Sequence, residues 1–327
     1  MRQMPLHLPK TARLWMTLAL VATTLAAAPR PALSQTVLKF GTANVNEGLL
    51  PLQVAIDQGF LKAEGIQAEY VNFQGGGPAV QAFVGGSIDF CVCAADHILR
   101  LASRGFDPRI IVGLDERHAY ALLAKADRPY TDLASLKGKR IGITAPGSLT
   151  DNTIRWALTS AGLNAERDVE IIKAGIGASM KAALTSDQVD AGTVASTEIL
   201  EFTRNGQFKI VLDWRPSPYP SLLVIGRERW VTAHPEVARG LVRAVGKAAR
   251  LIQENPAIAV QSVKTLYPSY STERAEEVAQ AAKQRLTPDG SVSTAGFDTM
   301  QDIVLLSDTT LKRVNKADVD LQPNLSR

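Results

Sequence analysis

The residues best placed to contact a ligand lie in four short loops, each of which precedes a predicted helix. The loops are residues 44–48, 74–77, 146–150 and 175–177. The first N–H groups of a helix have no partner within it, and the positive end of the helix dipole lies there. An anion at such a terminus gains roughly 0.3–1 kcal/mol, or about 2 kcal/mol when partly buried. The loops therefore favour binding of a small molecule through backbone donors.

Polar side chains in and near these loops extend the predicted site. The hydroxyls of Ser148 and Thr150 can donate to a ligand oxygen or simply cap a helix, and both interpretations stay open. Trp214, beside Arg215 in a proline-rich stretch, can stack on a ligand ring or pack as a rim. We expect ligand contacts from Asn44, Asn46, Gln74, Gly75, Gly76, Asp96, Gly147, Ser148, Leu149, Thr150, Gly177 and Trp214.

Residues that could perform catalysis are few. His97 follows Asp96, but adjacent side chains on a helix diverge, so the two are not expected to form a dyad. The sequence contains no GxSxG, Walker, GxGxxG or HExxH motif. We therefore predict a binding protein without catalytic residue, metal or cofactor. A secreted enzyme using His97 or Cys93 is the rival hypothesis.

The two cysteines, Cys91 and Cys93, lie two residues apart on a predicted strand. In a regular strand their Cα atoms would be roughly 6.5 Å apart, near the upper limit of disulfide geometry. We expect free thiols that pack as small apolar groups, with a metal pair or a reactive dithiol as the alternative.

The elements that position the loops form a unit that occurs twice. Residues 74–96 contain a glycine loop, a short helix and a strand, and residues 175–190 repeat this plan with one residue inserted. We expect Asp89 and Asp190, at matching places, to fix the turn into each strand through side-chain to backbone hydrogen bonds. Two copies predict two similar lobes.

Strands alternate with helices from residue 37 to a last strand at 221–226, and the remainder is predicted to be helical. This pattern indicates α/β lobes with mixed, mostly parallel sheets flanked by helices. We predict that lobe one contains residues 36–125 plus 222–327 and that lobe two contains 126–221. Crossings near 125–129 and 220–223 would form the hinge of a cleft.

The first 34 residues resemble a secretory signal peptide. Arg2, Lys10 and Arg13 precede an apolar run at 14–28 that is too short for a comfortable membrane span, and cleavage is expected near Ser34 or Gln35. No cysteine follows closely, so no lipid anchor is expected. Removal of this segment takes away four basic residues and no acidic one, which cancels the formal charge of +4. The basic pI therefore gives no reason to expect nucleic-acid binding, and we predict an exported, periplasmic monomer.

Several stretches, in order along the chain, resemble one family of periplasmic solute-binding proteins. They are residues 51–60, 64–66, 79–90, 136–143, 146–148 and 189–191. The family is the nitrate/sulfonate/taurine group of receptors for ABC importers, which also resembles pyrimidine-precursor-binding proteins. The resemblance implies a type II, Venus-flytrap fold that closes on a small ligand and delivers it to a membrane permease and its ATPase.

The resemblance leaves the ligand open. A proline often found at the third loop is replaced here by Asp96–His97, so a bound anion would need a basic partner such as Arg117 or Arg215. We expect a small organic anion, a sulfonate or carboxylate, with an aromatic acid as one option. A neutral pyrimidine-type heterocycle is the alternative ligand, and a sensory receptor domain is a further alternative role.

Overall fold

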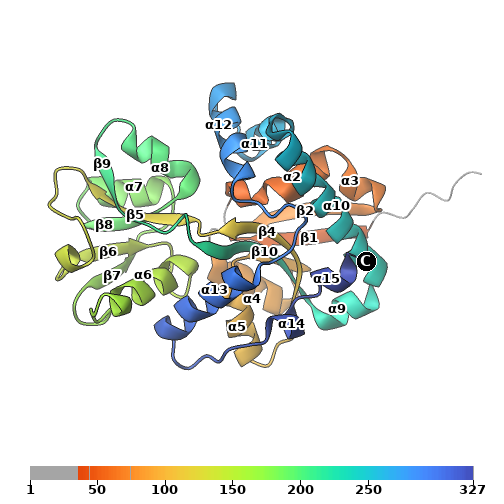
Figure 1. The fold of residues 1–327 in the computed structure, drawn as a ribbon, viewed down its shortest axis with the longest axis horizontal. Helices are drawn as coiled ribbons and strands as arrows, with labels where there is room; N and C mark the ends of the chain where they lie inside the picture. The colour runs from red at the N-terminus through yellow and green to blue at the C-terminus, as the bar shows by residue number, and fades with distance from the viewer. Residues whose placement is uncertain (1–35, 44, 74, 327) are drawn as a thin grey trace, which may run out of the picture. The chain divides into compact units, whose positions relative to one another are not determined.

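The computed structural model describes residues 36–43, 45–73 and 75–326 (Figure 1). The predicted signal peptide and the predicted ligand contacts Asn44 and Gln74 lie outside the described residues. The strands are β1 (Thr36–Thr42), β2 (Ile66–Asn72), β3 (Phe90–Cys93), β4 (Pro108–Arg117), β5 (Tyr120–Lys125), β6 (Arg140–Ile143), β7 (Glu170–Lys173), β8 (Ala191–Ala195), β9 (Phe208–Asp213) and β10 (Pro218–Arg227).

The strands form two five-stranded sheets with the same plan. Their orders are β2-β1-β3-β10-β4 and β7-β6-β8-β5-β9. In each sheet three strands pair in parallel, β2-β1-β3 in the first and β7-β6-β8 in the second. The strand that enters from the other sheet, β10 or β5, runs antiparallel to both of its neighbours. Two mixed α/β sheets, as predicted from the repeated unit, are therefore confirmed.

Helices cover both faces of each sheet. Those with the first sheet are η1 (Glu47–Leu49), α2 (Leu50–Asp57), α3 (Phe60–Ala63), α4 (Gly76–Gly85), α5 (Asp96–Ser103), α9 (Glu228–Ala233), α10 (Pro235–Glu254), η3 (Pro256–Ala259), α11 (Val260–Leu266), α12 (Thr272–Lys283), α13 (Thr294–Ser307), α14 (Lys316–Val319) and α15 (Gln322–Leu325). Those with the second are η2 (Ala134–Leu136), α6 (Leu149–Ser160), α7 (Ala178–Thr185) and α8 (Ser196–Thr203). Among the described residues, no helix combines the length and the hydropathy needed to span a bilayer.

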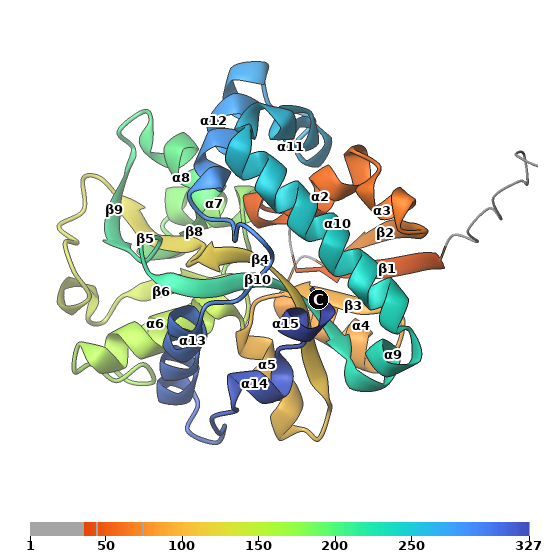
Figure 2. The same cartoon turned by 45° about the vertical axis from the view of Figure 1, so that its right-hand side comes forward.

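Apolar side chains fill both faces of the first sheet, which explains why its strands are buried on both sides. One cluster joins α2 and α10 to one face, and a second joins α4, α5 and α13 to the other. α10 starts at Pro235, where a missing N–H costs nothing, and buries Leu241, Val245, Ala248 and Ile252 on one side. α13 also lies against α6 of the second sheet, as Figures 1 and 2 both show.

The chain passes between the sheets through residues 118–119 and again through 214–217. The prediction had placed the crossings near 125–129 and 220–223, and β5 in the first lobe. β5 instead pairs with β8 and β9, and β10 begins before residue 222. We therefore propose lobes of residues 36–117 plus 218–326 and 120–213, with the two crossings as the hinge. No glycine or proline marks residues 118–119, so the first crossing could not be located from the sequence.

Asp89 and Asp190 make the predicted side-chain to backbone hydrogen bonds, but with a neighbouring strand and not with the turn before their own strand. Asp89 Oδ2 accepts from the N–H of Lys39 at 2.8 Å, and Asp190 Oδ2 accepts from the N–H of Arg140 at 3.0 Å. Each carboxylate thus bonds the backbone of the strand at the centre of its parallel trio, at matching places in the two lobes. The prediction of free thiols is wrong: Cys91 and Cys93 form a disulfide, with Cα atoms 5.4 Å apart. The strand is locally shorter than a regular one, which brings the pair within the common disulfide range.

Candidate functional site

A cavity of about 50 Å³ lies between the two lobes beside the crossings. Its first-lobe lining consists of Ala43, Asn46, Gly75, Gly76, Ala94, His97, Ser221 and Leu222, and its second-lobe lining of Ala119, Tyr120, Thr144, Ser148, Leu149 and Ile176. Most of these residues follow the carboxyl ends of parallel strands, where open α/β sheets bind ligands. The volume has room for only a few water molecules.

The structure brings some of the predicted site residues to this cavity and keeps others away. Asn46, Gly75, Gly76, Ser148 and Leu149 line it, whereas Asp96, Gly147, Thr150, Gly177 and Trp214 do not. His97 also lines the cavity, in keeping with its interpretation as a helix-start residue beside a cleft. Ala43, Ala94, Ala119, Tyr120, Thr144, Ile176, Ser221 and Leu222 were not among the predicted contacts. These residues lie at the cavity because they follow a strand end or a crossing. Their residue types, mostly small or apolar, do not indicate such a position in a sequence.

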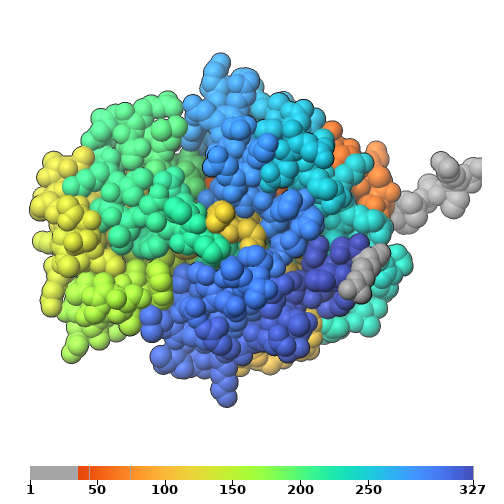
Figure 3. Space-filling model, in the orientation of Figure 1, coloured from red at the N-terminus to blue at the C-terminus, as the bar shows by residue number. Residues whose placement is uncertain are grey.

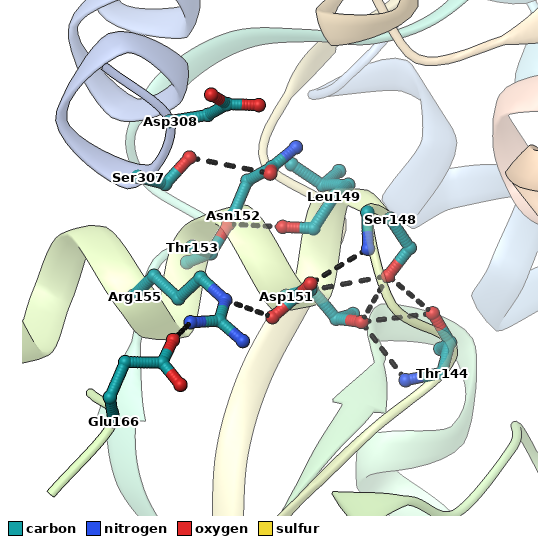
Figure 4. A network of polar contacts seen from close by, with 12 residues as sticks. Thr144, Ser148, Leu149, Asp151, Asn152, Thr153, Arg155, Glu166, Ser307 and Asp308 are labelled. Carbon is teal, nitrogen blue, oxygen red and sulfur yellow. Dashed lines mark hydrogen bonds and ion pairs between the residues drawn. The ribbon is translucent and has the colours of Figure 1, made fainter. Parts of the chain in front are cut away.

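The hydroxyls around the start of α6 bond to one another. Thr144 Oγ1 donates to Ser148 Oγ at 2.9 Å, and Thr150 Oγ1 lies 2.8 Å from Ser148 Oγ (Figure 4). Thr150 Oγ1 also accepts from the N–H of Thr144 at 3.0 Å, while Ser148 caps α6 by accepting from the N–H of Asp151. Thr150 is fully buried, and its hydroxyl bonds Thr144 and Ser148 instead of a helix N–H, so the cap of α6 is Ser148.

Substituting Thr150 by alanine is expected to lower the free energy of unfolding by about 1–3 kcal/mol, because the buried N–H of Thr144 loses its acceptor. Urea denaturation followed by circular dichroism measures this loss. Thr185→Ala is the matched control, since the Thr185 hydroxyl is exposed and bonds only within its own helix. Equal stability of the two variants would contradict the structural role of Thr150.

Two of the predicted anion-binding helix termini already hold carboxylates of the protein. At α6, Asp151 Oδ2 accepts from the N–H of Gly147 at 2.7 Å, and Asp151 is paired with Arg155 (Figure 4). At α7, the carboxyl group of Glu198, whose pKa burial raises to about 7, accepts from the N–H of Gly177. An acidic side chain at such a terminus occupies the donors that an external anion would use. At α4, the N-cap residue Gly75 and the first helical residue Gly76 line the cavity, and no side chain caps this helix.

Asp96 connects the lobes instead of facing the cavity. It is fully buried, and its Oδ2 accepts from Asn152 Nδ2 at 2.8 Å. Asn152 Oδ1 in turn accepts from Arg100 at 2.7 Å and from Ser307 at 3.3 Å, which ties α6 to α5 and α13; Figure 4 shows the bond to Ser307. Asp96 is not among the residues that line the cavity, and its other oxygen, Oδ1, is buried without a partner among the described residues.

Trp214 packs against the hinge and does not line the cavity. Its ring lies 5.8 Å from that of His118, and the ring of Tyr219 lies 5.3 Å from His118 on another side. His118 Nδ1 accepts from the N–H of Tyr120, so Nε2 carries the proton and donates to Thr153 Oγ1 at 2.8 Å. Burial lowers the pKa of His118 to about 3. A neutral histidine enclosed by aromatic rings thus anchors the first crossing to α6.

The basic residues expected to offset a bound anion lie elsewhere. Arg215 pairs with Asp213 at 2.6 Å, and Arg117 donates to the carbonyl of Pro216. Both line a separate groove of about 850 Å³ between α8 and β9 on one side and α12 on the other, visible as a hollow between the green and blue surfaces in Figure 3. No lysine, arginine, aspartate or glutamate is among the described residues that line the cavity.

A buried ion-pair cluster lies between this groove and the hinge. Arg285 pairs with Asp115 at 2.6 Å and with Glu47 at 3.3 Å. It also donates to the carbonyls of Arg117 and His118, at 3.1 and 3.2 Å, in the first crossing. Across the cleft, the Ser196 hydroxyl donates to Glu47, and Arg274 donates to the carbonyl of Thr197. These contacts hold the lobes together on the side of the groove.

A metal centre finds no support in the part of the chain that the structure describes, where no three histidine, cysteine, aspartate or glutamate side chains are grouped to hold an ion.

Comparisons with known proteins agree with this architecture. The family model described as NMT1/THI5 like matches residues 46–259. The chain is similar to a protein of known structure from Bordetella bronchiseptica RB50, with 26% identity and a TM-score of 0.78 over 88% of this chain and 95% of that one. It is also similar to the alkanesulfonate-binding protein SsuA from Xanthomonas axonopodis pv. citri bound to MOPS, with 20% identity and a TM-score of 0.70 over 90% and 99% of the chains. The predicted two-lobe periplasmic-binding-protein fold is thereby confirmed.

A relative of a different description is found among curated proteins. The chain is 25% identical over 238 residues to 4-amino-5-hydroxymethyl-2-methylpyrimidine phosphate synthase from Aspergillus parasiticus. The aligned region covers 68% of each of the two chains.

Proposed function

Because the chain belongs to the NMT1/THI5-like family, we propose that it is a periplasmic receptor that captures a small organic solute between its lobes. The closed form would deliver the solute to the permease and ATPase of an ABC importer. The observation that carries this proposal is the cavity at the hinge, lined from both lobes. Contacts from both lobes are what a solute needs to shift the balance toward closure, since only differential affinity moves such an equilibrium.

The cavity supports an uncharged ligand better than the organic anion expected from the sequence. A charge enclosed without a partner is costly, and neither arginine nor lysine is among the lining residues. The helix termini of α6 and α7 are also taken by Asp151 and Glu198. We therefore propose a neutral, planar heterocycle of the pyrimidine type. The pyrimidine named in the description of the Aspergillus parasiticus relative supports this class.

A small organic anion, such as a sulfonate or carboxylate, is the second candidate. The observation in its favour is the start of α4, which has no side-chain cap and lies at the cavity beside His97. The alkanesulfonate-binding neighbour supports the same class. The two candidates differ in salt dependence: an anion should bind more weakly as the ionic strength rises, whereas the affinity of a neutral heterocycle should not change.

We propose a transport receptor in preference to an enzyme, although one relative is named a synthase. Cys93 is buried and in a disulfide with Cys91, so it offers no thiolate nucleophile in this state. Export through the segment at 1–34, a monomeric state and action in the periplasm remain parts of the same proposal, supported by the signal-like sequence pattern.

A thermal-shift screen of residues 35–327 tests the receptor role. We expect a pyrimidine such as 4-amino-5-hydroxymethyl-2-methylpyrimidine, at about 100 times its dissociation constant, to add about 2.7 kcal/mol of stability and raise Tm by about 5 °C or more. Nitrate, taurine, ethanesulfonate and benzoate complete the panel.

A pair of variants locates the binding site in that screen. Ile176→Trp fills the cavity and should abolish the shift, whereas Ile210→Trp, on the exposed side of β9 in the wide groove, should keep it. Loss of the thermal shift in the Ile210 variant alone would show that the ligand binds in the wide groove and not in the cavity. No shift with any compound would count against a receptor for these solutes.

A further inference from the structure

Ser221 lines the cavity with a buried hydroxyl that has no partner. Its side chain follows the second crossing on β10 and is only 6% exposed. Its Oγ makes no hydrogen bond with any residue that the structure describes. The neighbouring cavity hydroxyl, that of Ser148, is engaged by Thr144 and Thr150. Buried polar groups are nearly always hydrogen-bonded, so an unpartnered one at a ligand cavity points to a partner supplied by the ligand.

His97 presents a second unpartnered polar group in the same cavity. It lies in the first turn of α5, is 4% exposed, and none of the hydrogen bonds among the described residues involves its ring. Gly76, the first residue of α4, has no side chain and so leaves space for the His97 ring. A Cβ added at Gly76 would lie 2.4 Å from His97 Nε2, which no real contact tolerates. The glycine loop thus makes room for the imidazole as well as for a ligand.

The two groups lie on the first-lobe side, while Leu149 and Ile176 provide an apolar wall from the second lobe. A neutral imidazole offers one donor and one acceptor, and a serine hydroxyl offers a donor and acceptors. This arrangement fits a flat ligand that has an apolar face and an edge with both a donor and an acceptor.

We infer that His97 and Ser221 are the specificity-determining pair of the cavity, which selects an uncharged ligand carrying a hydrogen-bond donor and acceptor on one edge, as in an aminopyrimidine or a primary amide. The inference rests on the proposed receptor function. It adds to that function the two side chains that recognise the ligand and the edge of the ligand with which they form hydrogen bonds.

Isothermal titration with 4-amino-5-hydroxymethyl-2-methylpyrimidine and with benzamide tests the pair. We expect His97→Ala and Ser221→Ala each to weaken binding about tenfold, the effect of one lost hydrogen bond. His97→Gln, which keeps a donor and an acceptor, should recover most of the affinity. Gly76→Ala should weaken binding as much as His97→Ala, because its methyl group displaces the ring. Benzoate should bind more weakly than benzamide.

Matched controls separate recognition from folding. His234→Ala and Ser103→Ala, exposed and outside the cavity, should bind like the unsubstituted protein. Ser221→Ala should leave Tm unchanged since no hydrogen bond is lost, whereas Ser262→Ala, which loses a bond to Asp57, should lower it.

The outcomes distinguish failure of the pair from failure of the receptor. Unchanged affinity in both the His97 and Ser221 alanine variants would overturn the pair and leave the receptor standing. Tighter binding of benzoate or ethanesulfonate than of the uncharged compounds, weakening as the ionic strength rises, would overturn the uncharged class alone. Absence of binding by every compound would overturn both proposals.

Discussion

Replacing Arg285 by methionine is expected to lower the free energy of unfolding by about 3–5 kcal/mol. Methionine keeps most of the apolar volume but leaves Asp115 and Glu47 buried without their cation. The carbonyls of Arg117 and His118 in the first crossing also lose their donor. Burial already raises the pKa of Asp115, with Arg285 opposing that rise, so removal of the arginine should favour the protonated acid.

Urea denaturation of the unsubstituted protein and the variant measures the loss. Arg313→Met is the control, because the Arg313–Asp302 pair is exposed and should contribute less than about 1 kcal/mol. Adding Asp115→Asn to Arg285→Met should recover part of the stability, since it removes the unpaired charge. A loss in the Arg285 variant no larger than in the control would show that the buried cluster does not hold the hinge.

Glu198 is expected to contribute a fall in stability of about 2–3 kcal/mol as the pH rises from about 5 to about 8, and Glu198→Gln should remove that contribution. His118 contributes in the opposite sense, because its lowered pKa adds stability as the pH rises toward 6.5, so the comparison is the difference between variant and unsubstituted protein at each pH. Burial, and then the neighbouring carboxylates Glu201 and Glu47, raise the pKa of Glu198 to about 7 from an ordinary 4.5. The folded protein therefore keeps the proton over a range in which the unfolded chain has released it. The native advantage is present below the ordinary pKa and is lost by the time the pH passes about 7.

Denaturation curves at several pH values across this range give the comparison. Glu236→Gln serves as the control because its carboxylate is exposed and Arg239 lowers its pKa. This variant should keep the pH dependence of the unsubstituted protein. The same pH dependence in the Glu198 variant would mean that Glu198 does not hold its proton in the fold.

The parts of the fold that follow from local chemistry could be predicted from the sequence. The repeated loop, helix and strand predicted two sheets of the same plan, and Asp89 and Asp190 sit in that plan as expected. Pro235 marks the start of α10, and the apolar spacing behind it gives the buried face. Each of these features depends on residues close in sequence or repeated at a fixed place.

The parts that depend on contacts between distant segments could not be predicted. β5 belongs to the second sheet because of its pairing with β8 and β9, and no turn residue marks the crossing before it. Asp96 accepts a hydrogen bond from Asn152 of the other lobe and does not line the cavity. Gly177 and Gly147 meet carboxylates, not a ligand, because Glu198 and Asp151 reach their N–H groups.

The residues that line the cavity could likewise be predicted only in part. Asn46, Gly75, Gly76, Ser148 and Leu149 could be selected since loops before helices are recognisable in a sequence. Ser221 could not, because a single serine on a strand gives no sign that its hydroxyl lacks a partner until the surrounding atoms are known.

Closure of the lobes on a solute is the central claim, and double electron–electron resonance between two spin labels measures it most directly. Cysteines introduced at exposed positions Glu276 on α12 and Arg204 after α8 would carry the labels, since Cys91 and Cys93 are joined to each other. The protein alone should show a broad distribution that includes distances longer than in the closed form. Saturation with the compound that gives the largest thermal shift should move it to a shorter, narrower one. An unchanged distribution at saturation would contradict the account.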